Sequence, residues 1–521
     1  MAPWLLPAVL FPWLLVWQGL DLTDFGHWVT KYQLFLTHPT EIENAASVQW
    51  LTHLVGGLLE PLARQHGLMV YRAAFAAVAS LLVLLVHGLL RGYFDPPTAA
   101  LASLLTCLAC ASGFGVTWLD SHAITALLYV LSAGLLHRGL LRGQPVLLAA
   151  AGAILALNAA VKPPNIAGLL LLTSIRCPRG IRAALLGFSL TGVACLAGVL
   201  LTGHLDGYLR LMGSLLTRVP GEPSHHDLAF LTAWLLRDQL LAVLIALGAL
   251  AVLPRIPRAW LPLALAAGVL MQARDGWRFL LPAFCYAVLG PLLLARGSRQ
   301  TGAQAAPGLR LLAGLSLAIV WLFPLGSTGG LRQPGGLWLA LGLALGVLLR
   351  GPRRVRACVL VAFLVFALPH AWNTVYRDGP DRLAMTATVA HPALRGILTT
   401  EERARCLEQL LTRLQEEGVR PGDVLLCYPK IPLVHYLTRT FPYLRHPAPV
   451  WFLRASDLDR ALTLAERDRR QPLVVRSRHV PEDWSYQPVV DAFLQRHPYR
   501  VVWSNHCFDV LRPSAPSEPP R

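Results

Sequence analysis

The sequence Asp21-Leu-Thr-Asp24-Phe-Gly-His27 begins where the first apolar run of the chain stops. Residues 1–20 carry no charge, and a helix of about 20 apolar residues crosses a bilayer core of about 30 Å. Two carboxylates therefore emerge at one predicted membrane face, where a site touches both water and lipid. The alternative is that Asp21 and Asp24 mark the membrane boundary and cap the next helix, because Asp is a favoured N-cap residue.

Composition predicts a polytopic membrane protein. Of 521 residues, 55% are hydrophobic and 14% are charged, whereas charged residues make up about 25% of a soluble protein. The net charge of +17 comes almost wholly from arginines that form short clusters between apolar runs. This is the pattern of cytoplasmic membrane loops rather than of a basic face, so it argues against a nucleic-acid partner.

The nine cysteines do not predict a metal or redox centre. Six lie inside or beside apolar runs, where cysteine is a small core residue. Cys107 and Cys110 form a CxxC, but there is no second pair to complete a zinc site. The three cysteines after residue 400 can form one disulfide, which leaves one thiol unpaired.

We expect about 11 to 13 transmembrane helices. The candidate runs are 3–20, 69–90, 98–118, 122–140, 145–161, 165–175, 183–203, 238–253, 259–273, 279–295, 309–325, 335–350 and 355–371. The run 165–175 is too brief to cross a bilayer unaided. The N-terminus lacks a basic segment and a cleavage site of small residues, so we interpret the first run as a retained helix.

The basic residues predict the orientation. Fifteen arginines lie in alternate connections, with Asp95 as the only acid among them. The arginines are Arg91, Arg138, Arg142, Arg176, Arg179, Arg182, Arg255, Arg258, Arg296, Arg299, Arg310, Arg350, Arg353, Arg354 and Arg356. The positive-inside rule therefore predicts an N-terminus in the cytoplasm and the 21–27 stretch outside the inner membrane. An odd number of helices places the C-terminal part outside as well.

Periodicity predicts the domain organisation. We expect a multi-helix transmembrane domain over 1–372 with two long outside loops, 21–68 and 204–237, in which short helices lie along the membrane surface. Residues 373–512 alternate helical and strand-like segments, which predicts a soluble α/β domain, and 513–521 are predicted to be disordered. The predicted strands and helices are 401–417, 424–428, 433–438, 457–465, 473–475, 489–495, 501–503 and 508–511. The domain has no glycine-rich phosphate-binding motif.

Candidate functional residues lie at the outside ends of the predicted helices. They are Asp21, Asp24, His27, Asp120, His122, Lys162, Asn165, Arg274, Asp275 and Arg278. Lys162 precedes Pro163-Pro164, a stiff turn that holds it at the interface, although a snorkelling anchor role is the alternative. Arg274 and Arg278 suit a phosphate because a guanidinium binds two oxygens at once. The alternative there is a loop salt bridge between Arg274 and Asp275.

Five motifs together resemble a known family. They are Asp21-Leu-Thr-Asp24, Trp118-Leu-Asp120-Ser-His, Lys162 before Pro-Pro, Arg278-Phe-Leu-Leu-Pro282, and Pro432-Leu-Val-His-Tyr-Leu-Thr. This set resembles the bacterial C-class membrane glycosyltransferases, which include protein O-mannosyltransferases and the aminoarabinose transferases that act on lipid A. The resemblance covers nearly the whole chain as architecture.

The resemblance implies roles for individual residues. Asp24 or Asp21 would serve as base or metal-site acid, with Asp120 in support, and Lys162 and Arg278, with Arg274, would bind the donor phosphate. Relatives often show two adjacent acids in the first loop, whereas this chain has Asp24-Phe25. A divalent metal ion held by Asp24 and Asp120 is therefore left open as the one candidate cofactor.

The implied function is transfer of a sugar from a polyprenyl-phosphate carrier to an envelope acceptor (lipid, glycan or protein) outside the cytoplasmic membrane. General chemistry agrees, because cations stabilise a phosphate leaving group and a carboxylate can accept the proton of an acceptor hydroxyl. One alternative is a transporter or flippase of a lipid-linked substrate, but the chain has no internal repeat and its polar residues cluster at one interface. The other alternative is that the chain is a non-catalytic envelope assembly factor.

Overall fold

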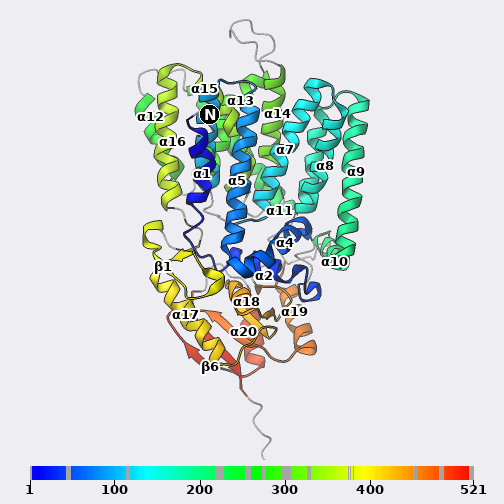
Figure 1. Cartoon of the computed structure of the whole chain (residues 1–521), viewed down its shortest axis with the longest axis vertical. Coiled ribbons are helices and arrows are strands. Elements are labelled where there is room, and N and C mark those ends of the chain that lie inside the picture. The colour runs from blue at the N-terminus through cyan, green and yellow to red at the C-terminus, as the bar shows by residue number, and fades with distance from the viewer. Residues whose placement is uncertain are drawn as a thin grey trace, which may run out of the picture. The chain divides into compact units, whose positions relative to one another are not determined.

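The computed structural model divides the chain into two compact units (Figure 1). The helical unit comprises Met1–Val16, Arg72–Gly198 and Leu228–Val375, and the mixed unit comprises Trp17–Tyr71, Val199–Asp227 and Tyr376–Arg521. The described residues are 3–42, 48–112, 118–216, 228–252, 260–272, 277–294, 307–325, 330–373, 375, 377–378, 381–449, 452, 454–479 and 486–514. The predicted disordered tail lies outside them from residue 515 on, as does 217–227 of the second predicted loop. The predicted domain boundaries stay a prediction.

Apolar helices build the helical unit and run side by side in Figure 1. They are α1 (Leu5–Leu14), α5 (Met69–Leu90), α6 (Pro96–Ser112), α7 (Ser121–Arg142), α8 (Pro145–Val161), α9 (Pro178–Leu201), α11 (Leu228–Val252), α12 (Trp260–Gln272), α13 (Trp277–Leu294), α14 (Pro307–Leu322), α15 (Trp338–Leu349) and α16 (Arg353–Asn373). The 3-10 segments of this unit are η3 (Pro163–Ser174), η6 (Gly330–Arg332) and η7 (Pro334–Leu337).

Helix length and composition identify candidate membrane crossings. Among the described helices, α5, α7, α9 and α13 are long and apolar enough to cross a membrane. Shorter apolar helices are α1, α6, α8, α14 and α15 with η7. The mostly helical fold with a small sheet near the C-terminus agrees with the predicted fold class, and the number of crossings stays a prediction.

The first apolar run forms a shorter helix than predicted. Helix α1 has ten residues, which rise about 15 Å, and it ends at Leu14 rather than at residue 20. Beyond it the backbone pairs with β2 (Leu398–Thr399): Leu398 N donates to Trp17 O at 2.8 Å, and Gly19 N donates to Leu398 O at 2.9 Å. This backbone pairing replaces the last predicted turns of the helix.

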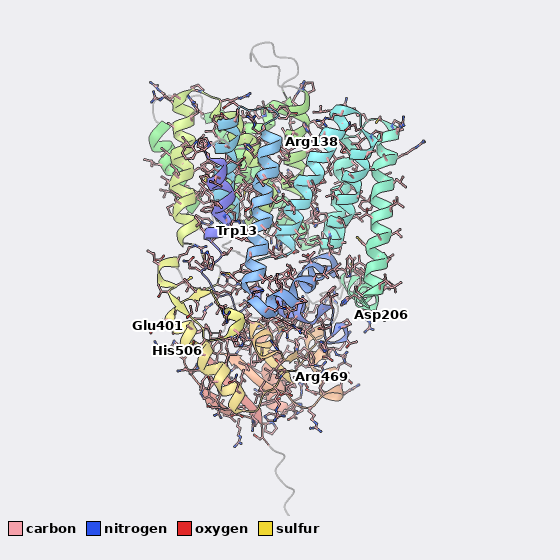
Figure 2. The ribbon with its side chains drawn as sticks, viewed as in Figure 1. Trp13, Arg138, Asp206, Glu401, Arg469 and His506 are labelled. Carbon is pink, nitrogen blue, oxygen red and sulfur yellow. A yellow bond between two sulfur atoms is a disulfide. The ribbon has the colours of Figure 1, made fainter. Side chains whose placement is uncertain are left out.

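Hydrogen bonds between side chains and backbone help to pack the helical unit. Trp13, labelled in Figure 2, donates through Nε1 to Ser80 Oγ at 3.1 Å, and Ser80 Oγ donates to Val9 O at 2.7 Å.

Helices α7 and α8 are joined by only Gly143 and Gln144, so they run antiparallel. The start of α7 therefore lies beside the end of α8.

The mixed unit combines segments from both ends of the chain. Its helices are α2 (Asp24–Phe35), α4 (Trp50–His66), α10 (Leu205–Leu216), α17 (Glu401–Glu416), α18 (Leu433–Thr438), α19 (Ala455–Asp468) and α20 (Gln487–Arg496), with short 3-10 turns η1 (Pro39–Glu41), η8 (Arg382–Ala384) and η9 (Pro392–Leu394). Its strands are β1 (Ala387–Thr388), β2, β3 (Val424–Tyr428), β4 (Phe441–Pro442), β5 (Leu473–Ser477), β6 (Tyr499–Ser504) and β7 (Phe508–Pro513).

Five strands form one sheet in the order β4-β3-β5-β7-β6. Strand β3 pairs in parallel with β4 and β5, whereas β7 pairs antiparallel with β5 and β6. Leu426 and Val474 from the central strands pack in one buried cluster with Leu458 and Leu462 of α19 and Phe493 of α20. The predicted alternation of strands and helices after residue 400 is thus present. The two-residue strands β1, β2 and β4 were not predicted from the sequence.

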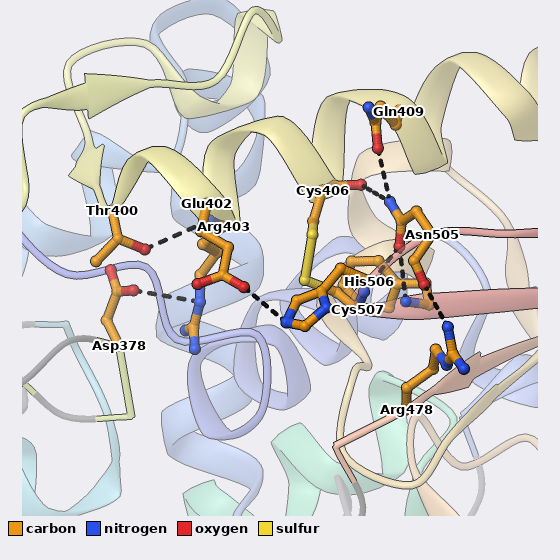
Figure 3. Close-up of a disulfide and its surroundings, with 11 residues drawn as sticks. Asp378, Thr400, Glu402, Arg403, Cys406, Gln409, Arg478, Asn505, His506 and Cys507 are labelled. Atoms are coloured by element: carbon orange, nitrogen blue, oxygen red, sulfur yellow. Dashed lines mark hydrogen bonds and ion pairs between the residues drawn. A yellow bond between two sulfur atoms is a disulfide. The ribbon is translucent and has the colours of Figure 1, made fainter.

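A disulfide joins Cys406 on α17 to Cys507 before β7 (Figure 3). The two Cα atoms are 6.0 Å apart, and 101 residues separate the cysteines in sequence. Asn505 reinforces this link, because its Nδ2 donates to Cys406 O at 3.0 Å and to Gln409 Oε1 at 3.1 Å. The prediction of one disulfide among the last three cysteines is confirmed, and Cys427 is the buried thiol left over.

Candidate active site

Asp21 accepts hydrogen bonds from backbone N–H groups at the start of α2. Its side chain is buried, with 1% of the residue exposed, and its two carboxylate oxygens accept hydrogen bonds from Thr23 N and Phe25 N, both at 2.8 Å. Burial, followed by the neighbouring Asp24 carboxylate, raises the pKa of Asp21 to about 7. The N-cap position of α2 is Thr23, which has no side-chain capping hydrogen bond, so Asp21 satisfies the Phe25 N–H of the first turn from a position before the helix.

Asp24 is the more accessible carboxylate of the pair. It is the first residue of α2, and its side chain is 26% exposed. Arg377 Nη1 donates to Asp24 Oδ1 at 2.9 Å. The two acids predicted as a pair thus have different surroundings: Asp21 binds backbone N–H groups and Asp24 binds a guanidinium.

The segment that carries Arg377 is anchored by Asp378. The buried Asp378 carboxylate accepts hydrogen bonds from Leu20 N at 2.5 Å and Thr399 Oγ1 at 2.7 Å, and it forms an ion pair with Arg403 Nε at 3.2 Å. Figure 3 shows Arg403 reaching from α17 to Asp378. Arg403 Nη1 also donates to Leu20 O at 2.8 Å and to Arg377 O at 2.6 Å. This network holds Arg377 beside the residues that precede Asp24.

Helix α2 packs tightly on the segment around α18. Thr23 Oγ1 donates to Lys430 O at 2.8 Å, and Leu433 N donates to Leu22 O at 3.1 Å. A Cβ on Gly26 would lie 2.3 Å from Leu433 N, so only glycine fits there without moving backbone. Two of the motifs found in the sequence, Asp21–Asp24 and Pro432–Thr438, are therefore adjacent in the mixed unit.

Basic side chains continue along α2 from Asp24. His27 and Lys31 follow at spacings of three and four residues, which places all three on one face of the helix. Burial lowers the pKa of Lys31 to about 7. Burial, then Lys31 and the His446 ring, lowers the pKa of His27, and the two histidine rings lie 5.4 Å apart. Lys31 was not among the candidate residues predicted from the sequence.

Asp120 and Lys162 meet at one end of the α7–α8 hairpin. Asp120 is the N-cap of α7: its Oδ1 accepts hydrogen bonds from His122 N at 3.0 Å and Ala123 N at 2.9 Å. Its Oδ2 lies 2.8 Å from His122 Nδ1. Lys162, in extended conformation, connects α8 to η3 and is 6% exposed.

Buried amides fix the turn that presents Lys162. Asn165 Nδ2 donates to Thr125 Oγ1 at 2.9 Å and to Asn158 Oδ1 at 3.0 Å. Burial lowers the pKa of Lys162 to about 8, and the Asp120 carboxylate opposes this shift. Within the described part of the chain, the Lys162 ammonium forms no salt bridge, so a buried cation stands beside an acid whose oxygens have other partners.

Arg278 has a carboxylate partner that the sequence analysis did not pair with it. Its Nη2 donates to Asp238 Oδ2 at 2.5 Å, between α13 and α11. Arg237 contacts the other oxygen of Asp238 at 3.3 Å. The Arg278 guanidinium is therefore already engaged, in contrast to the Lys162 ammonium. Arg274 and Asp275, the other predicted pair of this segment, lie outside the described residues.

The two candidate metal ligands belong to different compact units. Asp24 belongs to the mixed unit and Asp120 to the helical unit. Among the described residues, no group of three or more His, Cys, Asp or Glu side chains has the arrangement to hold a metal ion. A divalent ion at Asp24 or Asp120 stays a prediction, and no step of the chemistry below depends on one.

Comparison with solved structures gives the fold. ArnT from Cupriavidus metallidurans, solved with undecaprenyl phosphate bound, aligns with a TM-score of 0.51 and 13% identity over 97% of both chains. The Archaeoglobus fulgidus oligosaccharyltransferase, in a complex with Zn and sulfate, has a TM-score of 0.48 and 13% identity over 91% of this chain and 68% of that one. ArnT in the apo state gives 0.42 and 16% over 97% and 96%. No protein-family model and no curated protein sequence matches the chain.

The chain therefore has the fold of a C-class membrane glycosyltransferase. This conclusion rests on the alignment with ArnT bound to undecaprenyl phosphate, which spans nearly all of both proteins. The resemblance predicted from the five sequence motifs is confirmed at the level of the fold.

Proposed function

We propose that the chain is a membrane glycosyltransferase that moves a sugar from a polyprenyl-phosphate donor to an acceptor outside the cytoplasmic membrane. The observation that carries the proposal is the fold shared with ArnT over 97% of both chains, because that protein was solved with undecaprenyl phosphate bound. Helices that are long enough to cross a membrane support it, since a lipid-linked donor has to bind beside the bilayer.

In the proposed reaction, Asp24 acts as the general base. Its carboxylate accepts the proton of an acceptor hydroxyl while the hydroxyl oxygen bonds to C1 of the sugar. The bond between C1 and the phosphate oxygen breaks, and polyprenyl phosphate leaves with the electron pair. Asp24 is favoured over Asp21 because it is partly exposed, whereas Asp21 is buried and bound to backbone N–H groups. Arg377 orients the Asp24 carboxylate.

Lys162 is proposed as the main ligand of the donor phosphate. A fixed cation at the leaving oxygens stabilises the charge that develops there in the transition state. Lys162 suits this role because it is buried and, among the described residues, has no salt bridge that a phosphate would have to displace. Arg278 is proposed as a second ligand, which first has to exchange or share Asp238. Arg274 stays a candidate for the same phosphate.

The disulfide supports placement of the mixed unit outside the cytoplasm. Disulfides persist in oxidising compartments and are rare in the cytosol. The Cys406–Cys507 bond therefore fits the orientation that the arginine pattern predicts for the C-terminal part. If thiol alkylation of freshly lysed cells modifies both cysteines without prior reduction, the orientation is wrong.

Replacement of Asp24 by Asn tests the proposal. Asp24→Asn keeps the shape but removes the basic group, so transfer of labelled sugar from polyprenyl-phosphate donors in membranes should fall at least about 100-fold. Asp206→Asn is the matched control, because Asp206 is an exposed carboxylate at the start of α10 (Figure 2) and should leave transfer unchanged. Retention of transfer in both Asp24→Asn and Asp21→Asn would disprove the acid-site mechanism.

A further inference from the structure

The mixed unit contains a cavity that the proposed reaction does not use. It has a volume of about 300 Å³, at the lower end of the range for small-molecule pockets. Residues of α2, α4, η9, α17 and α18 line it, among them Gln33, Glu60 and Tyr436. All of these residues belong to the same compact unit.

The cavity lies on another face of α2 than the candidate base. Gln33 follows Asp24 by nine residues, which is about 13.5 Å along the helix axis and half a turn around it at 3.6 residues per turn. Asp24, His27 and Lys31 therefore occupy one face of α2, and Gln33 occupies the opposite one. A ligand in this cavity would bind apart from the reacting groups.

Gln33 gives the first indication of what the cavity binds. The residue is only 6% exposed, and among the described residues its side-chain Oε1 has no hydrogen-bond partner. An unsatisfied buried amide oxygen costs about 1 to 3 kcal/mol, so native proteins rarely leave one without a partner. A ligand with a hydroxyl or amide N–H would supply the missing donor.

Glu60 adds a second fixed acceptor. Its Oε2 accepts hydrogen bonds from Tyr71 at 2.7 Å and Tyr436 at 3.3 Å, and its Oε1 accepts one from Arg64 Nε at 3.0 Å. The carboxylate is thus held rigidly from three elements and keeps acceptor capacity on Oε1. An anion without hydroxyl or N–H groups would offer no donor to Gln33 or Glu60.

Arg439 supplies a cation to the same cavity. It lines the cavity just after α18, with a positive φ of 55°. Within the described part of the chain, its guanidinium forms no salt bridge, while Arg64 is already paired with Glu60. The lining therefore offers two acceptors for hydroxyl groups and one uncompensated positive charge.

We propose that this cavity is a binding site for an acidic sugar unit, with Gln33 and Glu60 contacting hydroxyl groups and Arg439 binding the carboxylate. A sugar presents donors and acceptors around one ring, which matches the amide and the carboxylate. The negative charge of a uronic acid matches Arg439. The site acts independently of sugar transfer, so its occupancy does not require Asp24.

Equilibrium dialysis of the purified full-length protein in detergent tests this site. Labelled glucuronic acid should bind more tightly than glucose, and acetate should not compete. Arg439→Gln should weaken glucuronic acid about tenfold or more, because a charge-assisted hydrogen bond contributes about 1.5 to 3 kcal/mol and 1.4 kcal/mol is a factor of ten. Arg439→Gln should leave glucose binding unchanged. Arg420→Gln, another exposed arginine on the same unit but outside the cavity, is the control.

Gln33→Leu should weaken both sugars at least tenfold, whereas Gln65→Leu, an exposed glutamine of α4 outside the cavity, should change neither. Thermal unfolding of Gln33→Leu checks that this variant is folded. If it is not, the effect of Arg439→Gln on glucuronic acid binding decides whether the site exists. Absence of glucuronic acid binding in the wild type, as expected for a cavity that holds only water, would overturn the proposal. Equal competition by acetate would also overturn it. Binding that survives in Asp24→Asn separates this site from the proposed function.

Discussion

Two places in the helical unit bring a cation and a carboxylate together, and they differ in what the carboxylate does. At the end of the α7–α8 hairpin, the oxygens of Asp120 cap α7 and contact His122, and Lys162 is left without a salt bridge among the described residues. Between α11 and α13, Asp238 binds Arg278 directly at 2.5 Å. Both cations were predicted from the sequence as phosphate ligands, and they differ in whether the neighbouring carboxylate forms a salt bridge with them among the described residues.

The largest effect on stability is expected from breaking the ion pair between Arg278 and Asp238. Among the described residues, Arg278→Gln leaves the buried Asp238 carboxylate with the mostly exposed Arg237 as its ion-pair partner. Loss of one partner of a buried ion pair costs about 3 kcal/mol or more. The double variant Arg278→Gln with Asp238→Asn should recover most of this free energy of unfolding. Thermal and denaturant unfolding in detergent measures both. Additive losses in the double variant would show that the two residues do not act as a pair.

Replacement of Lys162 should have the largest effect on donor binding. Lys162→Ala removes a charge-assisted contact to phosphate, which contributes about 1.5 to 3 kcal/mol, so donor affinity should fall roughly 10- to 100-fold. Protein stability should change little, because Lys162 forms no salt bridge with any residue that the structure describes. Arg354→Gln, an exposed arginine at the start of α16, is the charge control. Equal losses of donor affinity in the two variants would rule out a phosphate site at Lys162.

The pH dependence of donor binding sharpens the comparison further. Burial lowers the pKa of Lys162 to about 8, so the free ammonium loses its charge as the pH rises through that value. Donor affinity should be constant below pH 8 and fall by up to about tenfold per unit above it. In Lys162→Arg the decline should disappear, because a guanidinium stays protonated. A wild-type profile that is flat to pH 10 would contradict the charged-lysine assignment.

Breaking an exposed ion pair should have almost no effect on the free energy of unfolding. Arg405 and Glu401 on α17 form an ion pair at 3.1 Å, with side chains 65% and 82% exposed (Figure 2 labels Glu401). Solvent screens such a pair, so Glu401→Gln should change the free energy of unfolding by less than about 0.5 kcal/mol. A loss comparable to that of Arg278→Gln would mean that burial does not govern the strength of these pairs.

Local patterns predicted the elements whose limits depend on the chain alone. The bounds of α5, α8, β3 and α18 agree with the sequence analysis, because each element is a mainly apolar run between clear stops. Residues 165–175 were predicted as an α-helix, but Pro163 and Pro164 lead into the 3-10 segment η3. Residues 15–20 were predicted to continue α1, but Trp17 and Gly19 pair with Leu398 of β2, which lies almost 400 residues away.

The site was predicted as separate charges, and the structure gives them partners. Asp24 pairs with Arg377 across 353 residues and Arg278 pairs with Asp238 across 40. No helical or strand period connects such positions, so the pairing was not readable from the sequence. One signal was present: Asp238 interrupts an apolar run, and a charge in such a run is a functional candidate by default.

The packing of α2 on the α18 segment has a consequence for the order of synthesis. Thr23 leaves the ribosome early, yet its hydrogen-bond acceptor on Lys430 comes 407 residues later. At about 5 to 20 residues per second, that interval lasts roughly 20 to 80 seconds. During this time the growing chain lacks the α18 segment on which α2 packs. The start of α2 therefore reaches its final packing only after Lys430 has been synthesised.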